Sequence, residues 1–113
     1  MKLDIVTQDN LAIVRINETE LTSSKSPELK TELLKLVSEG YVNILVNLGM
    51  VSYIDSSGLS ALLFGRRQAI PSNGNLKLSC ISGNIMDMIK IAQLDKVFDI
   101  FDTEEEAIES FLY

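Results

Sequence analysis

The sequence predicts a mixed α/β fold in which short β-strands alternate with amphipathic helices. Runs rich in Val, Ile and Leu alternate with longer segments whose apolar residues recur every three or four positions. Polar segments containing Gly or Pro separate many of these elements. The length of 113 residues, of which 46% are hydrophobic and 23% charged, suits one compact globular domain. We therefore expect a single domain over residues 1–113.

The first elements are an expected β-hairpin and a helix. Residues 3–7 and 11–16 are rich in Val and Ile, and the polar turn formers of residues 8–10 lie between them. The helix is predicted to begin with Ser26 as its cap, Pro27 at the first helical position and Glu28 in the first turn. Gly40 is placed to end it.

A buried strand and a second helix form the middle of the chain. Residues 42–48 read VNILVNL, which is typical of a strand buried on both faces. Residues 49–55 connect this strand to a second helical pattern, whose apolar positions include Leu59, Leu62 and Leu63. The sequence PSNGN at residues 71–75 predicts a turn after that helix.

The last part of the chain repeats the alternation twice. Residues 76–81 (LKLSCI) and 97–101 read as strands, and Ser82 is the expected cap of a third helix between them. Thr103 and Glu106 have the spacing of a capping box at the start of a final helix. The order β-β-α-β-α-β-α-β-α predicts parallel neighbours, with the hairpin adding one antiparallel pair.

Composition excludes several classes of function. The net charge of -6 and the pI near 4.5 disfavour nucleic acid as a partner, because phosphate binding requires clustered Lys and Arg. The absence of His removes Ser-His-Asp triads, Cys-His pairs and His-based metal sites. Phosphate-binding loops, dinucleotide fingerprints, CxxC pairs and G-x-S-x-G motifs are missing from the sequence too. We therefore expect neither enzymatic activity nor a cofactor or metal.

The N-terminus has neither the basic region nor the apolar core of a signal peptide. No apolar run approaches the ~20 residues that cross a bilayer. We expect a cytoplasmic chain without membrane insertion.

The segment of residues 52–60 (SYIDSSGLS) is the candidate functional site. It follows a buried strand and enters a helix, at the carboxyl end where α/β sheets commonly place their sites. Asp and Ser are preferred N-cap residues, so the pattern is also that of a well-capped helix. A serine hydroxyl at a helix N-terminus is, in addition, well placed to carry a phosphate, whose charge of about -1.5 to -2 would meet free N–H groups.

Several motifs together resemble the signature of STAS domains, in the branch of the anti-sigma-factor antagonists. They are Val46-Asn47-Leu48, Tyr53-Ile54-Asp55-Ser56-Ser57-Gly58-Leu59, Leu62-Leu63, Gly65-Arg66 and Ile91-Ala92-Gln93-Leu94. The order of elements is similar along nearly the whole chain. The resemblance implies a mixed β-sheet with helices packed mainly on one face.

The resemblance also implies a function and its residues. An unphosphorylated antagonist binds a serine kinase of the anti-sigma type, the kinase phosphorylates the first serine after the motif's aspartate, and a phosphatase restores the protein. That serine is Ser56 here, with Asp55, Ser57, Gly58 and Leu59 shaping the acceptor loop that contacts the partner.

One stretch departs from the family pattern. Members commonly carry a Gly-Glu-Leu-Asp-like sequence after the second strand, and Glu20-Leu21-Thr22 is its nearest match here. The resemblance places Glu20 and Thr22 at the partner surface. The missing Gly and Asp imply a different cognate kinase or a different kind of regulatory complex.

Two alternatives stay open. The chain could be a STAS scaffold that never accepts phosphate, as a binding subunit of a stressosome-like or lipid-transport complex, with Ser56 only a helix cap. It could also bind a small molecule or nucleotide at the helix N-terminus. Against the latter, Arg66 and Arg67 lie two to three turns further along the helix, where we expect them to face solvent.

Overall fold

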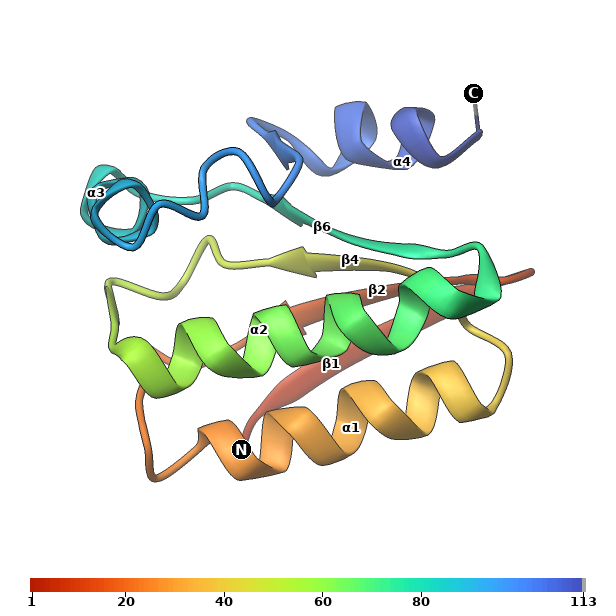
Figure 1. Cartoon of the computed structure of the whole chain (residues 1–113), viewed down its shortest axis with the longest axis horizontal. Coiled ribbons are helices and arrows are strands. Elements are labelled where there is room, and N and C mark those ends of the chain that lie inside the picture. Colours follow the sequence, from red (N-terminus) through yellow and green to blue (C-terminus); the bar gives the residue numbers. More distant parts are fainter. Residues whose placement is uncertain (113) are drawn as a thin grey trace.

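A five-stranded mixed sheet forms the centre of the fold (Figure 1). The computed structural model describes residues 1–112, and Tyr113 lies outside the described part. The strands are arranged in the order β1-β2-β4-β6-β7, and only the β1–β2 pair is antiparallel. Their bounds are β1 (Leu3–Gln8), β2 (Leu11–Ile16), β4 (Asn43–Asn47), β6 (Asn75–Ser79) and β7 (Ile100–Phe101). The predicted hairpin and the parallel neighbours are confirmed.

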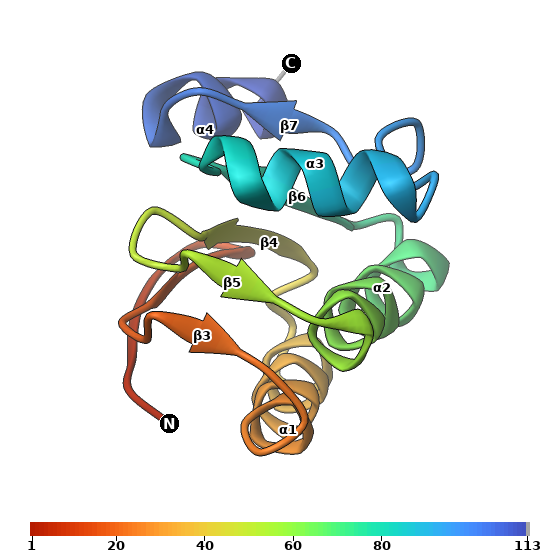
Figure 2. The ribbon, with the colours of Figure 1, turned by 90° about the vertical axis from the view of Figure 1, so that its left-hand side faces the viewer.

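Helices lie on both faces of this sheet. α1 (Ser26–Ser38) and α2 (Ser56–Ala69) run side by side across one face, whereas α4 (Glu104–Leu112) lies over the opposite face (Figures 1 and 2). α3 (Gly83–Ile91) packs next to β5 (Tyr53–Ile54), at the carboxyl end of the parallel strands (Figure 2). The predicted fold class is confirmed. The predicted packing of helices on one face holds for α1 and α2. α4 follows the last strand and lies on the other face.

The main core lies between the sheet and the α1–α2 layer. Alternate residues of the strands point into it, as the two-residue period of a strand requires. Apolar residues from α1, α2 and α3 complete a single buried cluster, and each of the following has at most 5% of its surface exposed: Ala12, Val14, Ile16, Leu29, Leu33, Ile44, Val46, Leu59, Leu62, Leu76, Leu78, Ile85 and Ile89.

Three predicted strands are shorter in the structure, and the one expected over residues 42–48 contains only Asn43–Asn47. β6 ends at Ser79, because Cys80 adopts a left-handed backbone conformation with φ of 64° that interrupts the extended chain. The last strand contains only Ile100–Phe101, since Val97 and Phe98 belong to a turn whose N–H groups donate to the Leu94 carbonyl. Phe98 is nevertheless almost fully buried in the core.

A second, two-stranded sheet was not predicted. β3 (Glu20–Leu21) pairs in parallel with β5, with Glu20 opposite Tyr53 and Leu21 opposite Ile54 (Figure 2). Leu21 and Ile54 are fully buried, whereas Glu20 and Tyr53 are exposed. This small sheet fixes the chain directly before α1 and directly before α2.

The predicted start of α1 is corrected by the structure. Lys25, and not Ser26, holds the cap position, and its side chain makes no capping bond. Ser26 is the first helical residue and is buried, which places Pro27 one position later than predicted. The other predicted caps are confirmed, because Ser82 Oγ accepts from Ile85 N at 3.4 Å and Thr103 Oγ1 accepts from Glu106 N at 3.2 Å.

Glu104 attaches the N-terminus of α4 to the sheet. Its carboxylate accepts two hydrogen bonds of 2.9 Å from Arg15 and one of 2.6 Å from Asn47. The hydrogen bonds from Arg15, followed by the one from Asn47, lower the pKa of Glu104 despite partial burial. The paired charges therefore hold α4 against β2 and β4 while both groups are ionised.

Candidate functional site

The candidate site lies where β5 enters α2, beyond the carboxyl end of β4. Asp55 has an extended backbone (φ -104°, ψ -176°), and the helix begins at the next residue. The pairing of β3 with β5 brings the segment before α1 alongside. Two chain segments far apart in sequence therefore meet at the N-termini of two neighbouring helices.

Asp55 is the N-cap of α2. Its Oδ1 accepts a 2.5 Å hydrogen bond from Ser57 Oγ and a 3.1 Å bond from Gly58 N. The Ser57 hydroxyl is the largest cause of a lowered pKa for Asp55, and backbone N–H groups of Gly58, Ser57 and Ser23 add to it. The carboxylate is thus held ionised at the positive end of the helix.

The two adjacent serines differ in their surroundings. Ser57 is half-buried, and its hydroxyl contacts both Asp55 and Ser26. Ser56 is exposed, and no side-chain hydrogen bond holds its hydroxyl within residues 1–112. Of these two hydroxyls, that of Ser56 is therefore the more accessible to other molecules.

Gly58 and Leu59 pack the first turn of α2 onto the β3–β5 sheet. A Cβ atom on Gly58 would lie 2.5 Å from Leu21 O and 2.6 Å from Ile54 Cγ1, so a larger residue cannot fit without displacing backbone. Leu59 is 5% exposed and joins the core. Both residues place the helix terminus rather than present a reactive group.

The structure brings Glu20 and Thr22 close to this turn. Glu20 is exposed on β3, opposite Tyr53 in the strand pairing. Thr22 is half-buried in the loop that follows, and its carbonyl accepts from the N–H groups of Lys25 and Ser26 and from the Ser26 hydroxyl. Ser26 in turn contacts Ser57, so the Thr22 loop is joined to the acceptor turn.

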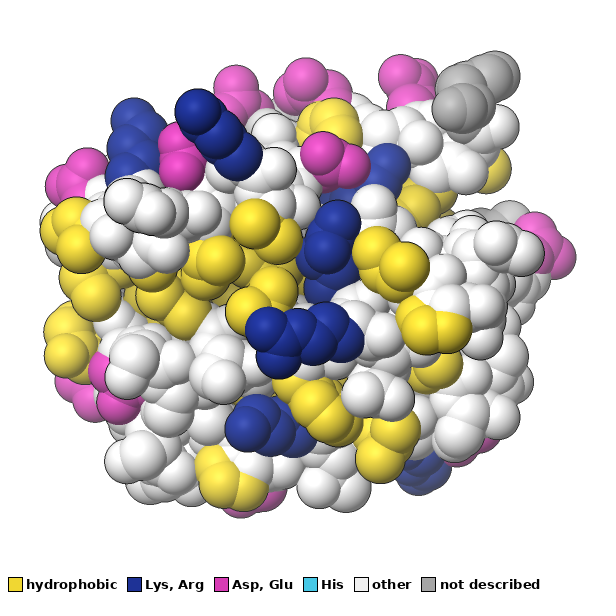
Figure 3. Space-filling model, in the orientation of Figure 1, with side chains coloured by type: hydrophobic (Ala, Val, Ile, Leu, Met, Phe, Trp, Pro, Cys, Tyr) yellow, Lys and Arg dark blue, Asp and Glu magenta, His cyan; other side chains and the backbone are white. Residues whose placement is uncertain are grey.

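Sequence reasoning missed Met50 at this end of the molecule, and it gave Tyr53 no role beyond its place in the segment of residues 52–60. Met50 is 57% and Tyr53 51% exposed, although both are types that favour burial or interfaces. Figure 3 shows hydrophobic side chains gathered between α3 and α2, with Lys and Arg side chains in the middle of the same face. Arg66 departs from its prediction, because its side chain is half-buried with a buried Nε.

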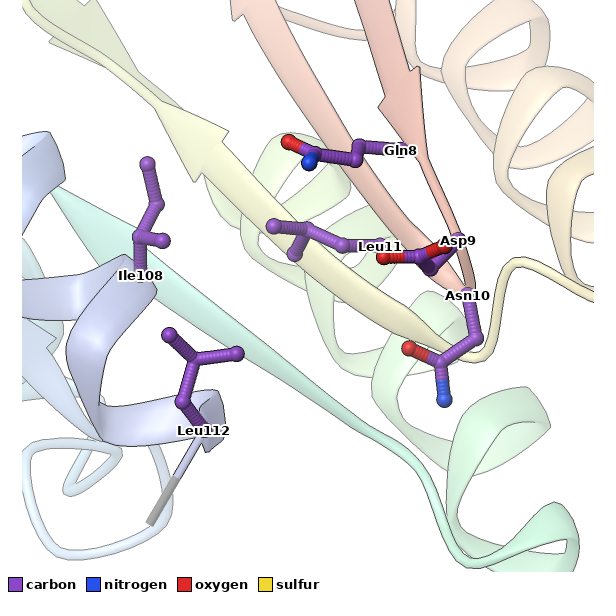
Figure 4. A pocket seen from close by; sticks show the side chains of 6 residues that line it. All are labelled: Gln8, Asp9, Asn10, Leu11, Ile108 and Leu112. Atoms are coloured by element: carbon purple, nitrogen blue, oxygen red, sulfur yellow. The ribbon is translucent and has the colours of Figure 1, made fainter.

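A small cleft lies elsewhere, between the β1–β2 turn and α4 (Figure 4). Its volume is about 140 Å³, below the ~300 Å³ at which small-molecule pockets begin. Its lining residues are Gln8, Asp9, Asn10, Leu11, Ile108 and Leu112. Because Leu11 starts β2 opposite Asn43 of β4, the cleft lies at the other end of the parallel strands from Ser56.

Two further properties concern the described residues as a whole. Within residues 1–112, no helix is both long and apolar enough to cross a membrane. The same residues contain no group of three acidic or Cys side chains arranged to hold a metal ion.

The family model of the STAS domain matches residues 2–107, which include every site residue described above. The chain belongs to the STAS domain family. An anti-sigma-B factor antagonist of Staphylococcus epidermidis is 30% identical over 106 residues, covering 93% of this chain and 96% of the relative.

Solved STAS structures share the fold. The STAS domain protein of Planctomyces limnophilus, an anti-sigma-factor antagonist, superposes with a TM-score of 0.88 at 15% identity, covering 98% of both chains. The antagonist SpoIIAA in its unphosphorylated form gives a TM-score of 0.85 at 20% identity, covering 96% of this chain and 95% of its own. The phosphorylated form of SpoIIAA from Bacillus gives 0.75 at 20% identity, with coverage of 96% and 98%.

Proposed function

We propose that this STAS protein is an anti-sigma factor antagonist that works by partner switching in the cytoplasm. Unphosphorylated, it binds a serine kinase of the anti-sigma type, which then releases its sigma factor. The observation that carries this proposal is the contrast between the free, exposed Ser56 hydroxyl and the restrained Ser57 hydroxyl beside it. The relatives named as anti-sigma factor antagonists, and the phosphorylated form known for SpoIIAA, support it.

In this proposal the chain contributes a substrate hydroxyl and no catalytic group. Ser56 Oγ attacks the γ-phosphorus of ATP held by the kinase, ADP leaves, and the hydroxyl proton passes to a base on the kinase. Magnesium stays with the kinase as well. Water, activated by a serine phosphatase, later hydrolyses the phosphoserine and restores the hydroxyl.

Release follows from charge. A phosphate on Ser56 brings about -1.5 to -2 charges next to the ionised Asp55, so a polar surface becomes strongly anionic. Partner groups that pack against Asp55, Ser56 and Ser57 lose affinity through repulsion and desolvation. Glu20, Thr22 and the exposed Tyr53 extend the same contact surface on the β3–β5 side.

Two substitutions at Ser56 test the switch. Ser56→Ala keeps the neutral surface, so we expect it to bind the kinase as tightly as the unphosphorylated protein and to resist release by Mg-ATP. Ser56→Asp carries a permanent negative charge, so we expect binding at least tenfold weaker, which corresponds to ~1.4 kcal/mol. Isothermal titration calorimetry against the purified anti-sigma kinase measures both.

Ser72→Asp is the matched control, because Ser72 is exposed in the 3-10 turn (Ile70–Ser72) beyond the opposite end of α2 from Ser56. It adds the same charge away from the acceptor. Equal affinity of Ser56→Ala and Ser56→Asp would contradict the switch and favour a scaffold that never accepts phosphate.

A further inference from the structure

Ser26 is a buried polar residue whose hydroxyl joins two loops. Among the described residues, only Ser26 and Ser79 are polar and almost fully buried. Ser26 Oγ lies 2.8 Å from Thr22 O and 3.1 Å from Ser57 Oγ. It therefore contacts both the loop before α1 and the first turn of α2, a connection that no local sequence pattern indicates.

The proton arrangement gives these contacts a direction. The hydroxyls of Ser26 and Ser57 have two protons for three contacts, with Thr22 O, with each other and with Asp55 Oδ1. The ionised Asp55 attracts the Ser57 proton, since a charge-assisted hydrogen bond is about twice as strong as a neutral one. Ser57 Oγ is then the acceptor of the Ser26 contact, and the Ser26 proton is shared between Ser57 and the Thr22 carbonyl.

We propose that Ser26 is a positioning residue for the phosphoacceptor Ser56, acting through Ser57. The proposal rests on the proposed function and names a determinant of the same site. Consecutive helical residues are rotated by about 100°. The contacts of Ser57 with Asp55 and Ser26 anchor the first turn of α2, and this anchored turn holds the neighbouring Ser56 toward solvent and toward the kinase.

The same contacts connect the acceptor to the partner-facing loop. Thr22 O accepts the Ser26 hydroxyl, and Thr22 Oγ1 lies 3.4 Å from Ser24 Oγ in the same loop. A phosphate on Ser56 repels the Asp55 carboxylate and so withdraws the group that orders the Ser57 hydroxyl. That change reaches the loop through the successive contacts of Asp55 with Ser57, of Ser57 with Ser26 and of Ser26 with Thr22.

A mutant cycle in the phosphorylation reaction tests this role. Ser26→Ala, Ser57→Ala and the double variant are phosphorylated by the purified anti-sigma kinase with Mg-ATP. We expect Ser26→Ala to lower kcat about five-fold with KM for the protein nearly unchanged, since a hydrogen bond worth ~1 kcal/mol is lost in orienting the acceptor. The double variant should be no slower than Ser57→Ala alone, because both substitutions break one chain of contacts.

Matched variants separate positioning from folding. Ser26→Thr retains the hydroxyl and should restore kcat, whereas Ser38→Ala removes an exposed hydroxyl from the far end of α1 and should change nothing. If Ser26→Ala fails to fold by circular dichroism, Ser26→Cys supplies a side chain of similar size with a weaker donor. We expect amide NMR shifts at Ser23 and Gly58 in Ser26→Ala and not in Ser38→Ala.

The outcomes distinguish the two proposals. A wild-type protein that takes no phosphate from the kinase overturns the proposed function and, with it, this role of Ser26. A phosphorylated wild type with an unchanged rate in folded Ser26→Ala, or with additive losses in the double variant, overturns the role of Ser26 alone.

Discussion

Gly58→Ala is expected to destabilise the fold, although alanine is the better helix former. The added Cβ would lie 2.5 Å from Leu21 O and 2.6 Å from Ile54 Cγ1. The first of these atoms belongs to the backbone of the β3–β5 sheet and cannot rotate away. The substitution therefore pushes the acceptor turn away from β3.

The size of the effect follows from two opposing contributions. Overpacking a buried site costs about 1–3 kcal/mol, and contact with backbone places Gly58 at the upper end. Replacing Gly by Ala inside a helix stabilises the helix by up to about 1 kcal/mol. A net loss of ~2 kcal/mol remains, which lowers the melting temperature of a domain this size by about 8 °C.

Gly83→Ala is the control. Gly83 also lies in the first turn of a helix, but a Cβ there meets no heavy atom within 4 Å, so its substitution should be neutral or slightly stabilising. Urea unfolding followed by circular dichroism measures both variants. A Gly58→Ala protein as stable as Gly83→Ala would refute the close packing of α2 on Leu21.

Two further predictions concern the face covered by α4. Pairing with Arg15 lowers the pKa of Glu104, so its stabilising contribution is complete above the usual value of 4.5 and is lost as pH falls through the lowered pKa. Glu104→Gln should therefore cost on the order of 1 kcal/mol of stability at pH 7, and this difference from wild type should disappear in acid. The exposed Glu105→Gln variant should match the stability of wild type at both pH values. Urea unfolding across pH measures this. Lys77 Nζ lies 4.5 Å from the centre of the Phe111 ring and donates to Ser110 Oγ at 2.9 Å, and only 12% of the side chain is exposed. Lys77→Met should therefore keep the packing and lose about 2 kcal/mol by thermal denaturation. A stability of Lys77→Met equal to that of wild type would show that the charge contributes nothing.

The longer elements of the fold could be predicted from the sequence because their signals are local. Val and Ile runs marked β1, β2 and β4, and apolar residues at helical spacing marked all four helices. β3 and β5 have two residues each, too few for any periodic pattern, and form by pairing Glu20 with Tyr53 across the chain. Cys80 shortened β6 through a backbone conformation that its residue type does not indicate.

The candidate site was only partly visible in the sequence. Asp55 and its helix N-terminus follow from capping chemistry, and the STAS resemblance singled out Ser56. Ser26 has the residue type and spacing of a cap, yet the turn at Thr22 moves it into the helix, where packing of α1 against α2 brings it to Ser57. Contacts of this kind depend on tertiary packing, so no local pattern could separate the roles of the two adjacent serines.

Phosphorylation of Ser56 is the central claim, and mass spectrometry tests it most directly. Intact-mass and tandem measurements on the protein from its native cells, with a Ser56→Ala strain as control, locate any phosphate along residues 52–60. We expect a single phosphate on Ser56 in the wild type and none in the variant. An unmodified protein across growth and stress conditions, or a phosphate on Ser57, would contradict the claim.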